Sequence, residues 1–234
     1  MRILVIDDEL PTLKMFVLIL NAMGHEVLTA ESGEQGLEVM RAEKPPLVLT
    51  DIKMPGMDGI EVLRKIKEEN QATEVIVITG HGDMDLAIKA LNLDATDFIN
   101  KPVRREALQG ALSRAEERMQ LKHDKAVALN IFLREDAAVI AVRGSLSTAS
   151  ESALKDAFRH ASRSRVNIIL DFAENTSING AAIAVLADCI RSARADGCRI
   201  AMAGLSDNFR QVLDVMGISR QVTAFRRLED VVFP

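Results

Sequence analysis

Several polar residues in the first half of the chain follow short apolar runs, where their side chains could together act on a phosphoryl group. They are Asp7, Asp8, Asp51, Thr79 and Lys101. An aspartate becomes a useful phosphoryl acceptor only when other groups neutralise the incoming oxygens and hold them in line, because positioning and electrostatics supply nearly all of the catalysis. Asp51 is the candidate acceptor, since the other residues are of the types that this task requires.

Each of these residues has a distinct chemical role available to it. Asp7, Asp8 and Asp51 supply the oxygen cluster that suits Mg²⁺, which prefers few carboxylates and several waters. Lys101 offers a positive point charge, and Thr79 offers a hydroxyl hydrogen bond to a phosphoryl oxygen. An aspartate at a strand end is usually a turn former or a helix cap. It is the combination of residue types that favours a site.

The elements that must position these residues alternate along the chain. Apolar runs end next to the polar residues at Ile3–Ile6, Leu47–Leu49, Val75–Ile78 and Phe98–Ile99. Such runs, each followed by a helical stretch, predict parallel strands whose carboxyl ends share one edge, where open α/β sheets bind ligands. We therefore expect an α/β fold with a doubly wound, five-stranded parallel sheet. The helices are expected near residues 12–22, 33–42, 58–68, 83–91 and 104–122.

Local signals mark two of the helix starts. Asp58 precedes a helix that carries Glu61 three residues later, which is a capping arrangement. Pro11 falls in a first helical turn, where a missing N–H is tolerated. The fifth helix carries about two heptads, so it either packs on its own domain or pairs with a second chain. Packing is the expectation, and a homodimer through this helix stays a hypothesis.

Residues 1 to about 120 resemble the receiver domain of two-component response regulators, a family with a flavodoxin-like fold. The resemblance rests on Asp7-Asp8, on Asp51–Pro55 followed by Met57–Gly59, on Thr79-Gly80 and on Lys101-Pro102, in this order. It implies that a histidine kinase phosphorylates Asp51.

The resemblance also implies the roles of the surrounding residues. Asp8 and Asp51 would bind Mg²⁺ directly, with Asp7 nearby and with the backbone carbonyl of Lys53 as a further ligand. Thr79 and Lys101 would bind the phosphoryl group. Phe98 stands where receivers commonly carry an aromatic residue that turns inward on activation. A fixed core phenylalanine explains Phe98 equally well, and both interpretations stay open.

The second half of the chain begins with a predicted hairpin. Its strands are Ala128–Arg134 and Ala138–Val142, joined by the polar turn Glu135-Asp136. A helix opening at Thr148, with Glu151 three residues later, follows. The pattern then predicts a strand at 166–172, a helix at 180–196, a strand at 199–203, a helix at 208–216, a strand at 221–225 and a short final helix. We expect a second α/β domain with a mixed sheet.

Residues from about 126 to the end resemble a STAS domain, the module shared by sulfate transporters and anti-sigma-factor antagonists. The resemblance rests on the order of elements, on Ile168–Phe172, on Ser177–Asn179 at the mouth of a helix and on Val215–Ile218. We therefore expect a receiver domain at 1–122, a linker at 123–126 and a STAS domain at 127–234.

The predicted helix mouth departs from the pattern of the antagonists. In those proteins it typically reads Asp-Ser-Ser-Gly, and a partner kinase phosphorylates the first serine. Here the corresponding residues are Asn179, Gly180, Ala181 and Ala182, so the acceptor hydroxyl is missing. Ser177 is expected to pack or to form a local hydrogen bond. The resemblance thus suggests that control of the STAS surface has moved to Asp51 in the receiver.

Composition limits the classes of partner. Residues 1–124 hold 15 Lys+Arg against 22 Asp+Glu, and residues 125–234 hold 14 against 12, which together give the net charge of −5. An acidic first half, with Trp and Tyr absent, argues against nucleic acid. No apolar stretch approaches the ~20 residues that span a membrane, and we expect a cytoplasmic protein without a membrane partner. Cys189 and Cys198 are expected to be buried thiols.

Three functions compete at this level. The leading one is a response regulator whose STAS output binds an anti-sigma factor or a related switch kinase, with no enzymatic turnover of its own. A second is a Mg²⁺-dependent phosphohydrolase, which the Lys53 side chain disfavours because a general acid is expected at that position. A third makes the STAS half an assembly scaffold or a sensor that binds an anion or nucleotide at Asn179 and Gly180.

Overall fold

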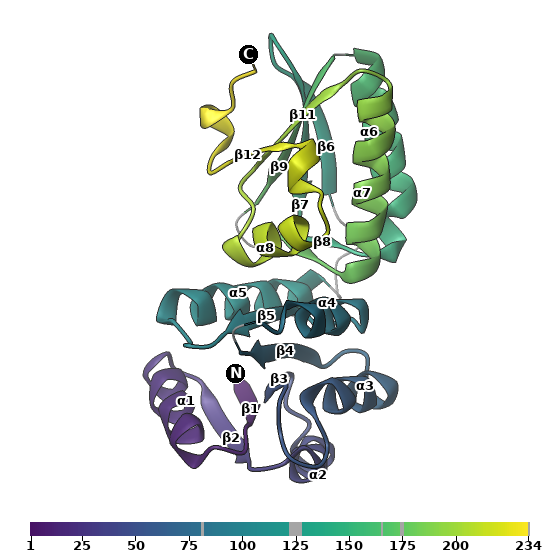
Figure 1. Ribbon diagram of the computed structural model, residues 1–234. Helices are drawn as coiled ribbons and strands as arrows, with labels where there is room; N and C mark the ends of the chain where they lie inside the picture. The colour runs from purple at the N-terminus through teal and green to yellow at the C-terminus, as the bar shows by residue number, and fades with distance from the viewer. Residues whose placement is uncertain (81, 122–127, 165, 174–175, 234) are drawn as a thin grey trace. The chain divides into compact units, whose positions relative to one another are not determined.

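The computed structural model describes residues 1–80, 82–121, 128–164, 166–173 and 176–233. By its internal contacts the chain divides into two compact units, Met1–Met119 and Gln120–Pro234, which Figure 1 shows coloured along the sequence. The predicted linker at 123–126 lies outside the described residues. The predicted limits of the two domains therefore stay predictions.

The first unit is an alternation of strands and helices. Its elements are β1 (Arg2–Ile6), α1 (Leu10–Ala22), β2 (Glu26–Ala30), α2 (Gly33–Glu43), β3 (Leu47–Asp51), α3 (Gly59–Glu69), β4 (Glu74–Thr79), α4 (Met84–Asn92), β5 (Asp97–Asn100) and α5 (Arg105–Leu121). The strands are all parallel and lie in the order β2-β1-β3-β4-β5. The expected five-stranded parallel sheet is confirmed.

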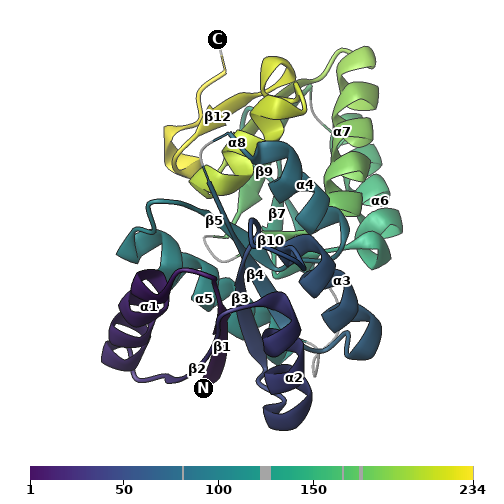
Figure 2. The same ribbon diagram turned by 60° about the horizontal axis from the view of Figure 1, so that its bottom comes forward.

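Helices cover both faces of this sheet, and successive strand residues point to opposite faces. On one face Ile3, Val5, Leu49 and Ile78 pack with apolar residues of α1 and α5 in a single cluster. Helices α2, α3 and α4 contact the sheet on the other face, and Figure 2 shows α1 and α5 on one side with α2 and α3 opposite. Helix α5 therefore packs on its own unit, as expected from its short heptad pattern.

The predicted helix starts occur where the sequence places them. Asp58 precedes α3, and its carboxylate accepts the N–H of Glu61 at 2.8 Å. Pro11 lies in the first turn of α1, which begins at Leu10. These local contacts fix the ends of the two helices that follow β1 and β3, where the predicted site begins.

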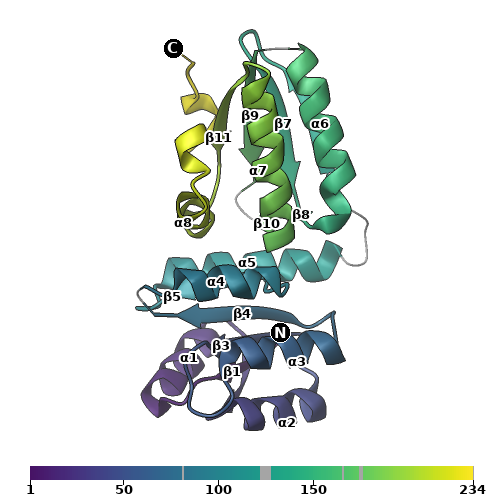
Figure 3. The same cartoon turned by 45° about the vertical axis from the view of Figure 1, so that its right-hand side comes forward.

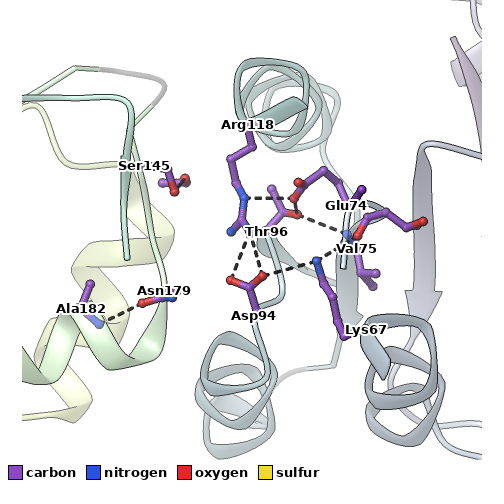
Figure 4. Close-up of polar contacts among 12 residues, drawn as sticks. Lys67, Glu74, Val75, Asp94, Thr96, Arg118, Ser145, Asn179 and Ala182 are labelled. Atoms are coloured by element: carbon purple, nitrogen blue, oxygen red, sulfur yellow. Dashed lines mark hydrogen bonds and ion pairs between the residues drawn. The ribbon is translucent and has the colours of Figure 1, made fainter. Parts of the chain in front are cut away.

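A network of ion pairs, in which Glu74 and Arg118 are buried and Asp94 is partly exposed, connects α5 to the amino ends of the strands (Figure 4). The guanidinium of Arg118 lies 3.0 Å from a carboxylate oxygen of Glu74 and 3.0 Å from one of Asp94. Glu74 is fully buried, and the hydroxyl of Thr96 also donates to it. Lys67 of α3 reaches Asp94 at 3.6 Å. A second buried pair, Arg114 with Asp97, lies on the same helix.

Replacing Arg118 tests the energetic weight of this network. Arg118→Met would remove the guanidinium that pairs with the fully buried Glu74, and we expect a loss of about 3–5 kcal/mol in the free energy of unfolding. Urea denaturation of the whole chain measures it. Arg64→Met is the matched control, because Arg64 is half exposed in its ion pairs on α3 and should cost less than about 1 kcal/mol. Equal costs for the two variants would contradict the network's role.

The second unit has a mixed sheet. Its elements are β6 (Ala128–Leu133), β7 (Ala138–Arg143), β8 (Ser145–Leu146), a 3₁₀ turn η1 (Thr148–Ser150), α6 (Glu151–Ser164), β9 (Asn167–Phe172), β10 (Ser177–Ile178), α7 (Gly180–Ala195), β11 (Arg199–Ala203), α8 (Asp207–Val215), η2 (Ser219–Gln221), β12 (Thr223–Phe225) and η3 (Leu228–Asp230). The main sheet runs β12-β11-β9-β7-β6, and only β6 is antiparallel to its neighbour. The expected mixed sheet is confirmed.

Some details of the second unit differ from the expectations. The strands β8 and β10 form a small separate parallel pair that was not predicted, because two residues are too few to give a pattern. The final helix is the single 3₁₀ turn η3, and Thr148 opens a 3₁₀ turn before α6 rather than α6 itself. Helices α6 and α7 lie side by side on the sheet (Figure 3). Val231 and its neighbours pack against Val139 and Ile169.

Candidate functional site

The carboxyl ends of the first unit's strands bring the predicted site residues to one edge. Asp7 and Asp8 follow β1, Asp51 ends β3, Thr79 ends β4 and Lys101 follows β5. The sheet register confirms the alignment of the three neighbouring strands, since Asp51 lies opposite Ile78 and Thr79 lies opposite Asn100. The positions of these residues at the ends of the predicted strands therefore predicted the common edge at which the structure places all five.

Lys101 holds two aspartates together at this edge. Its Nζ lies 3.0 Å from Oδ2 of Asp51 and 3.3 Å from Oδ2 of Asp7. The other oxygen of Asp7 accepts the backbone N–H of Glu9 at 2.9 Å. Asp7 is fully buried and Asp51 is 6% exposed. The ammonium group thus compensates part of the negative charge that the strands carry to this edge.

Burial and the contact between the two groups shift the pKa values of Asp51 and Lys101. Burial raises the pKa of the Asp51 carboxyl, and the charge of Asp7 adds to this, so the contact with Lys101 offsets only part of the rise. Burial lowers the pKa of Lys101, but its hydrogen bond to Asp51 and the two carboxylate charges raise it more, and its pKa lies above the ordinary value. The lysine therefore stays charged, while Asp51 remains under-compensated.

The donor set fits a divalent cation. Asp7, Asp8 and Asp51 each offer a carboxylate oxygen, and these oxygens lie within 4.8 Å of one another. Three carboxylates against one ammonium leave two negative charges at the site, which a divalent cation would balance. Asp8 is exposed, so water can complete a coordination shell there. The residues present are those that suit Mg²⁺.

The start of α3 lies against the backbone of Asp51 and Ile52. The Gly59 N–H donates to the Ile52 carbonyl at 2.9 Å. A Cβ on Gly59 would come within 2.0 Å of the Asp51 carbonyl oxygen, which no side chain permits. Gly59 was identified only as part of a family pattern, and its close approach explains in physical terms why glycine is needed there.

The structure gives the positions of three further predicted residues, and their functions stay predictions. They are Thr79, Phe98 and Lys53. Thr79 is buried, and its hydroxyl lies 3.4 Å from the Gly80 carbonyl oxygen that accepts it. Phe98 is fully buried, which is compatible with both interpretations of its role. The Lys53 ammonium lies 2.8 Å from a carboxylate oxygen of Asp83, just before α4. Sequence reasoning missed Asp83, because nothing in its spacing separates it from an ordinary surface aspartate.

The helix mouth of the second unit is capped from within. The Asn179 side-chain oxygen accepts the N–H of Ala182 at 2.9 Å, a contact that Figure 4 shows. The hydroxyl of Ser177 is buried, as expected for a packed residue, and donates to the Ser145 hydroxyl at 2.9 Å, so its hydrogen bond crosses to the neighbouring strand β8 rather than staying local in the sequence. A salt bridge between Arg143 and Asp171 was not predicted.

The arrangement in the first unit defines a class of protein: a doubly wound α/β module with an acidic side-chain cluster, bridged by a lysine, at the carboxyl edge of its sheet. Residues 3–113 match the family model of the response regulator receiver domain, and residues 131–227 match the model described as Mlab, STAS domain. The chain belongs to the response regulator receiver family and carries a STAS domain in its second half.

Known proteins similar to this chain share the receiver part. Sporulation initiation phosphotransferase F of Bacillus subtilis is 32% identical over 113 residues, which are 48% of this chain and 91% of that protein. The transcriptional regulatory protein GlrR of Escherichia coli is 37% identical over 116 residues, which are 50% of this chain and 26% of that protein. The chain therefore spans about a quarter of GlrR, one of the first curated relatives.

A solved structure agrees with this assignment. The crystal structure of a response regulator receiver domain protein from Clostridium thermocellum has a TM-score of 0.50 and 40% sequence identity, and covers 52% of this chain and 98% of its own. Among the described residues, no helix has the length and apolar character needed to cross a membrane.

The contact between Gly59 and Asp51 predicts a steric penalty. Gly59→Ala should lower the free energy of unfolding by about 3 kcal/mol, since the backbone must move to accept the new Cβ. Urea denaturation measures the change. Gly24→Ala is the control within the same unit: Gly24 has φ +85° and open space around a Cβ, so only backbone strain of about 1 kcal/mol is expected. A Gly59→Ala cost no larger than the control would rule out the steric account.

Proposed function

We propose that this protein is a two-component response regulator in which a histidine kinase phosphorylates Asp51 and the STAS domain is the output. The observation that carries the proposal is the contact of Lys101 with both Asp51 and Asp7 at the carboxyl edge of the sheet. Such a cluster of side chains can neutralise and orient a phosphoryl group. The receiver and STAS family matches support the same reading.

Each residue of this cluster has its own part in the proposed phosphoryl transfer. An oxygen of Asp51 bonds to phosphorus while the bond between phosphorus and the kinase's histidine nitrogen breaks. The Lys101 ammonium pairs with the added phosphoryl oxygens, and Thr79 turns its hydroxyl from the Gly80 carbonyl toward them. Mg²⁺ held by Asp8, Asp51 and the Lys53 carbonyl, with Asp7 nearby, would supply charge neutralisation when bound.

The surroundings of Asp51 favour a switch over a phosphohydrolase. The residue two positions after Asp51 is Lys53, whose ammonium is paired with Asp83, so no carboxylic acid stands at this position to protonate a leaving group. The phosphoryl group would therefore remain on Asp51 until water removes it slowly. We propose that the protein has no other enzymatic activity.

The STAS domain is proposed to bind a protein, namely an anti-sigma factor or a related switch kinase. The mouth of α7 carries Asn179 and Gly180 and lacks a hydroxyl to phosphorylate. The Asn179 side chain already satisfies the Ala182 N–H, and an anion or nucleotide would have to displace it. This favours a protein surface over the ligand-sensor and scaffold alternatives, and it leaves Asp51 as the proposed control point.

Phosphorylation of purified protein tests the receiver half. With acetyl phosphate and Mg²⁺, the chain should gain the mass of one phosphoryl group, and Asp51→Asn should gain none. Lys101→Ala should slow the gain by about 10²–10³-fold, because a preorganised positive charge is lost. Lys65→Ala is the control, since Lys65 lies in an exposed pair on α3. Full phosphorylation of the Asp51→Asn variant would refute the assignment of the acceptor.

Capture of partners tests the output half. Affinity purification from native cytoplasm, with and without beryllofluoride and Mg²⁺, should yield a kinase-like anti-sigma partner in only one state, since a ligand shifts only states that it binds differently. Asp51→Ala should give the same capture under both conditions. Identical captures by the unaltered chain would refute gating by the receiver.

A charge at the α7 mouth should weaken that capture. Ala181→Asp adds a carboxylate at an exposed position of the first turn, where it mimics a phosphoryl charge without harming the helix. We expect at least a tenfold loss of partner affinity, measured by calorimetry with the captured partner. Ala153→Asp places the same charge in the first turn of α6 and should have no such effect. Equal affinities for both variants would place the partner elsewhere.

A further inference from the structure

The outer strand of the second sheet lacks the usual protection of an edge. Strand β6 pairs with β7 on one side, and among the described residues no strand pairs with its other side. Its sequence, ALNIFL, contains no charge and no proline. Phe132 is 46% exposed and Leu133 is 56% exposed. Natural edge strands usually carry charges, prolines or bulges that prevent pairing with another chain.

The hydrogen bonds of the hairpin identify which backbone groups of β6 face outward. The Arg134 N–H donates to the Ala137 carbonyl at 2.8 Å, so these two residues form a hydrogen-bonded pair. Such pairs alternate along an antiparallel ladder, and the register therefore turns the N–H and C=O groups of Asn130 and Phe132 toward β7. The groups that face outward belong to Leu129, Ile131 and Leu133.

These outward groups are complementary to those of a second copy. A two-fold axis through Ile131 sets Ile131 against itself and Leu129 against Leu133 of the other copy. The three pairs would exchange roughly six hydrogen bonds, with no donor or acceptor of the segment left over. The charged turn that follows, where Arg134 pairs with Asp136, stays beyond the paired segment. An isologous contact of this kind closes on itself as a dimer.

The side chains support the same register. Leu129, Ile131 and Leu133 alternate with Phe132, so the paired strands would bring two identical apolar stripes together on one face. On the other face Phe132 would lie opposite Asn130 of the second copy. We propose that β6 is a homodimer interface, through which two chains join their STAS sheets into one continuous sheet. This interface differs from the dimer through α5 suggested by the sequence.

The test uses sedimentation of the whole chain over a concentration series reaching about 100 μM, where a contact with a micromolar Kd is populated. The chain should form a reversible dimer. Ile131→Lys and Ile131→Glu should each raise the dissociation constant at least tenfold, because like charges then lie directly opposite. An equimolar mixture of the two variants should dimerise again, since opposite charges then meet at the axis.

Two further variants guard the result against misfolding. Leu133→Lys changes a more exposed position and should weaken the dimer similarly, with circular dichroism and melting temperature unchanged. Val166→Lys is the matched control, because Val166 is 64% exposed and directly precedes β9, which β7 separates from β6 in the sheet. The proposal is overturned by a chain that stays monomeric, by Ile131→Lys dimerising as the unaltered chain does, or by no recovery in the mixture.

Discussion

The candidate site of the first unit depends on one lysine that partly neutralises three aspartates. Parallel strands deliver their terminal side chains to one edge, and here three of those side chains are aspartates. Lys101 bridges two of them, so the three carboxylates and the one ammonium leave two negative charges at the site. A divalent cation would balance these two negative charges. The Lys101 ammonium could then exchange its carboxylate contacts for contacts with phosphoryl oxygens.

In the proposed function, the receiver half carries the residue that is modified and the STAS half carries the binding surface. The STAS half keeps a well-formed helix mouth, in which Asn179 caps α7 and Ser177 is tied to Ser145. Positions 179–182 at that mouth carry no hydroxyl group. The proposed function therefore assigns the modifiable carboxylate to Asp51 of the receiver half and the binding surface to the STAS half.

The sequence was sufficient where the signal is local or periodic. Apolar runs and helical spacing predicted both sheets, and Asp58 predicted the cap of α3 that the structure contains. The five site residues could be placed at one edge because parallel strands have a fixed direction. Contacts made by distant residues were not predictable: the Lys53–Asp83 pair depends on how two loops approach each other, and β8 and β10 are too short to leave a pattern.

The two buried arginines of α5 determine the rotational position of this helix on the sheet, in addition to the stability of the first unit. Arg114 and Arg118 lie one turn apart, so both point along the same stripe of the helix toward buried carboxylates at the starts of β4 and β5. Turning the helix by a single residue, about 100°, would withdraw both guanidinium groups at once. The two ion pairs therefore fix the rotational position of α5 about its own axis, and the helix can turn only if both buried carboxylates lose their guanidinium contacts.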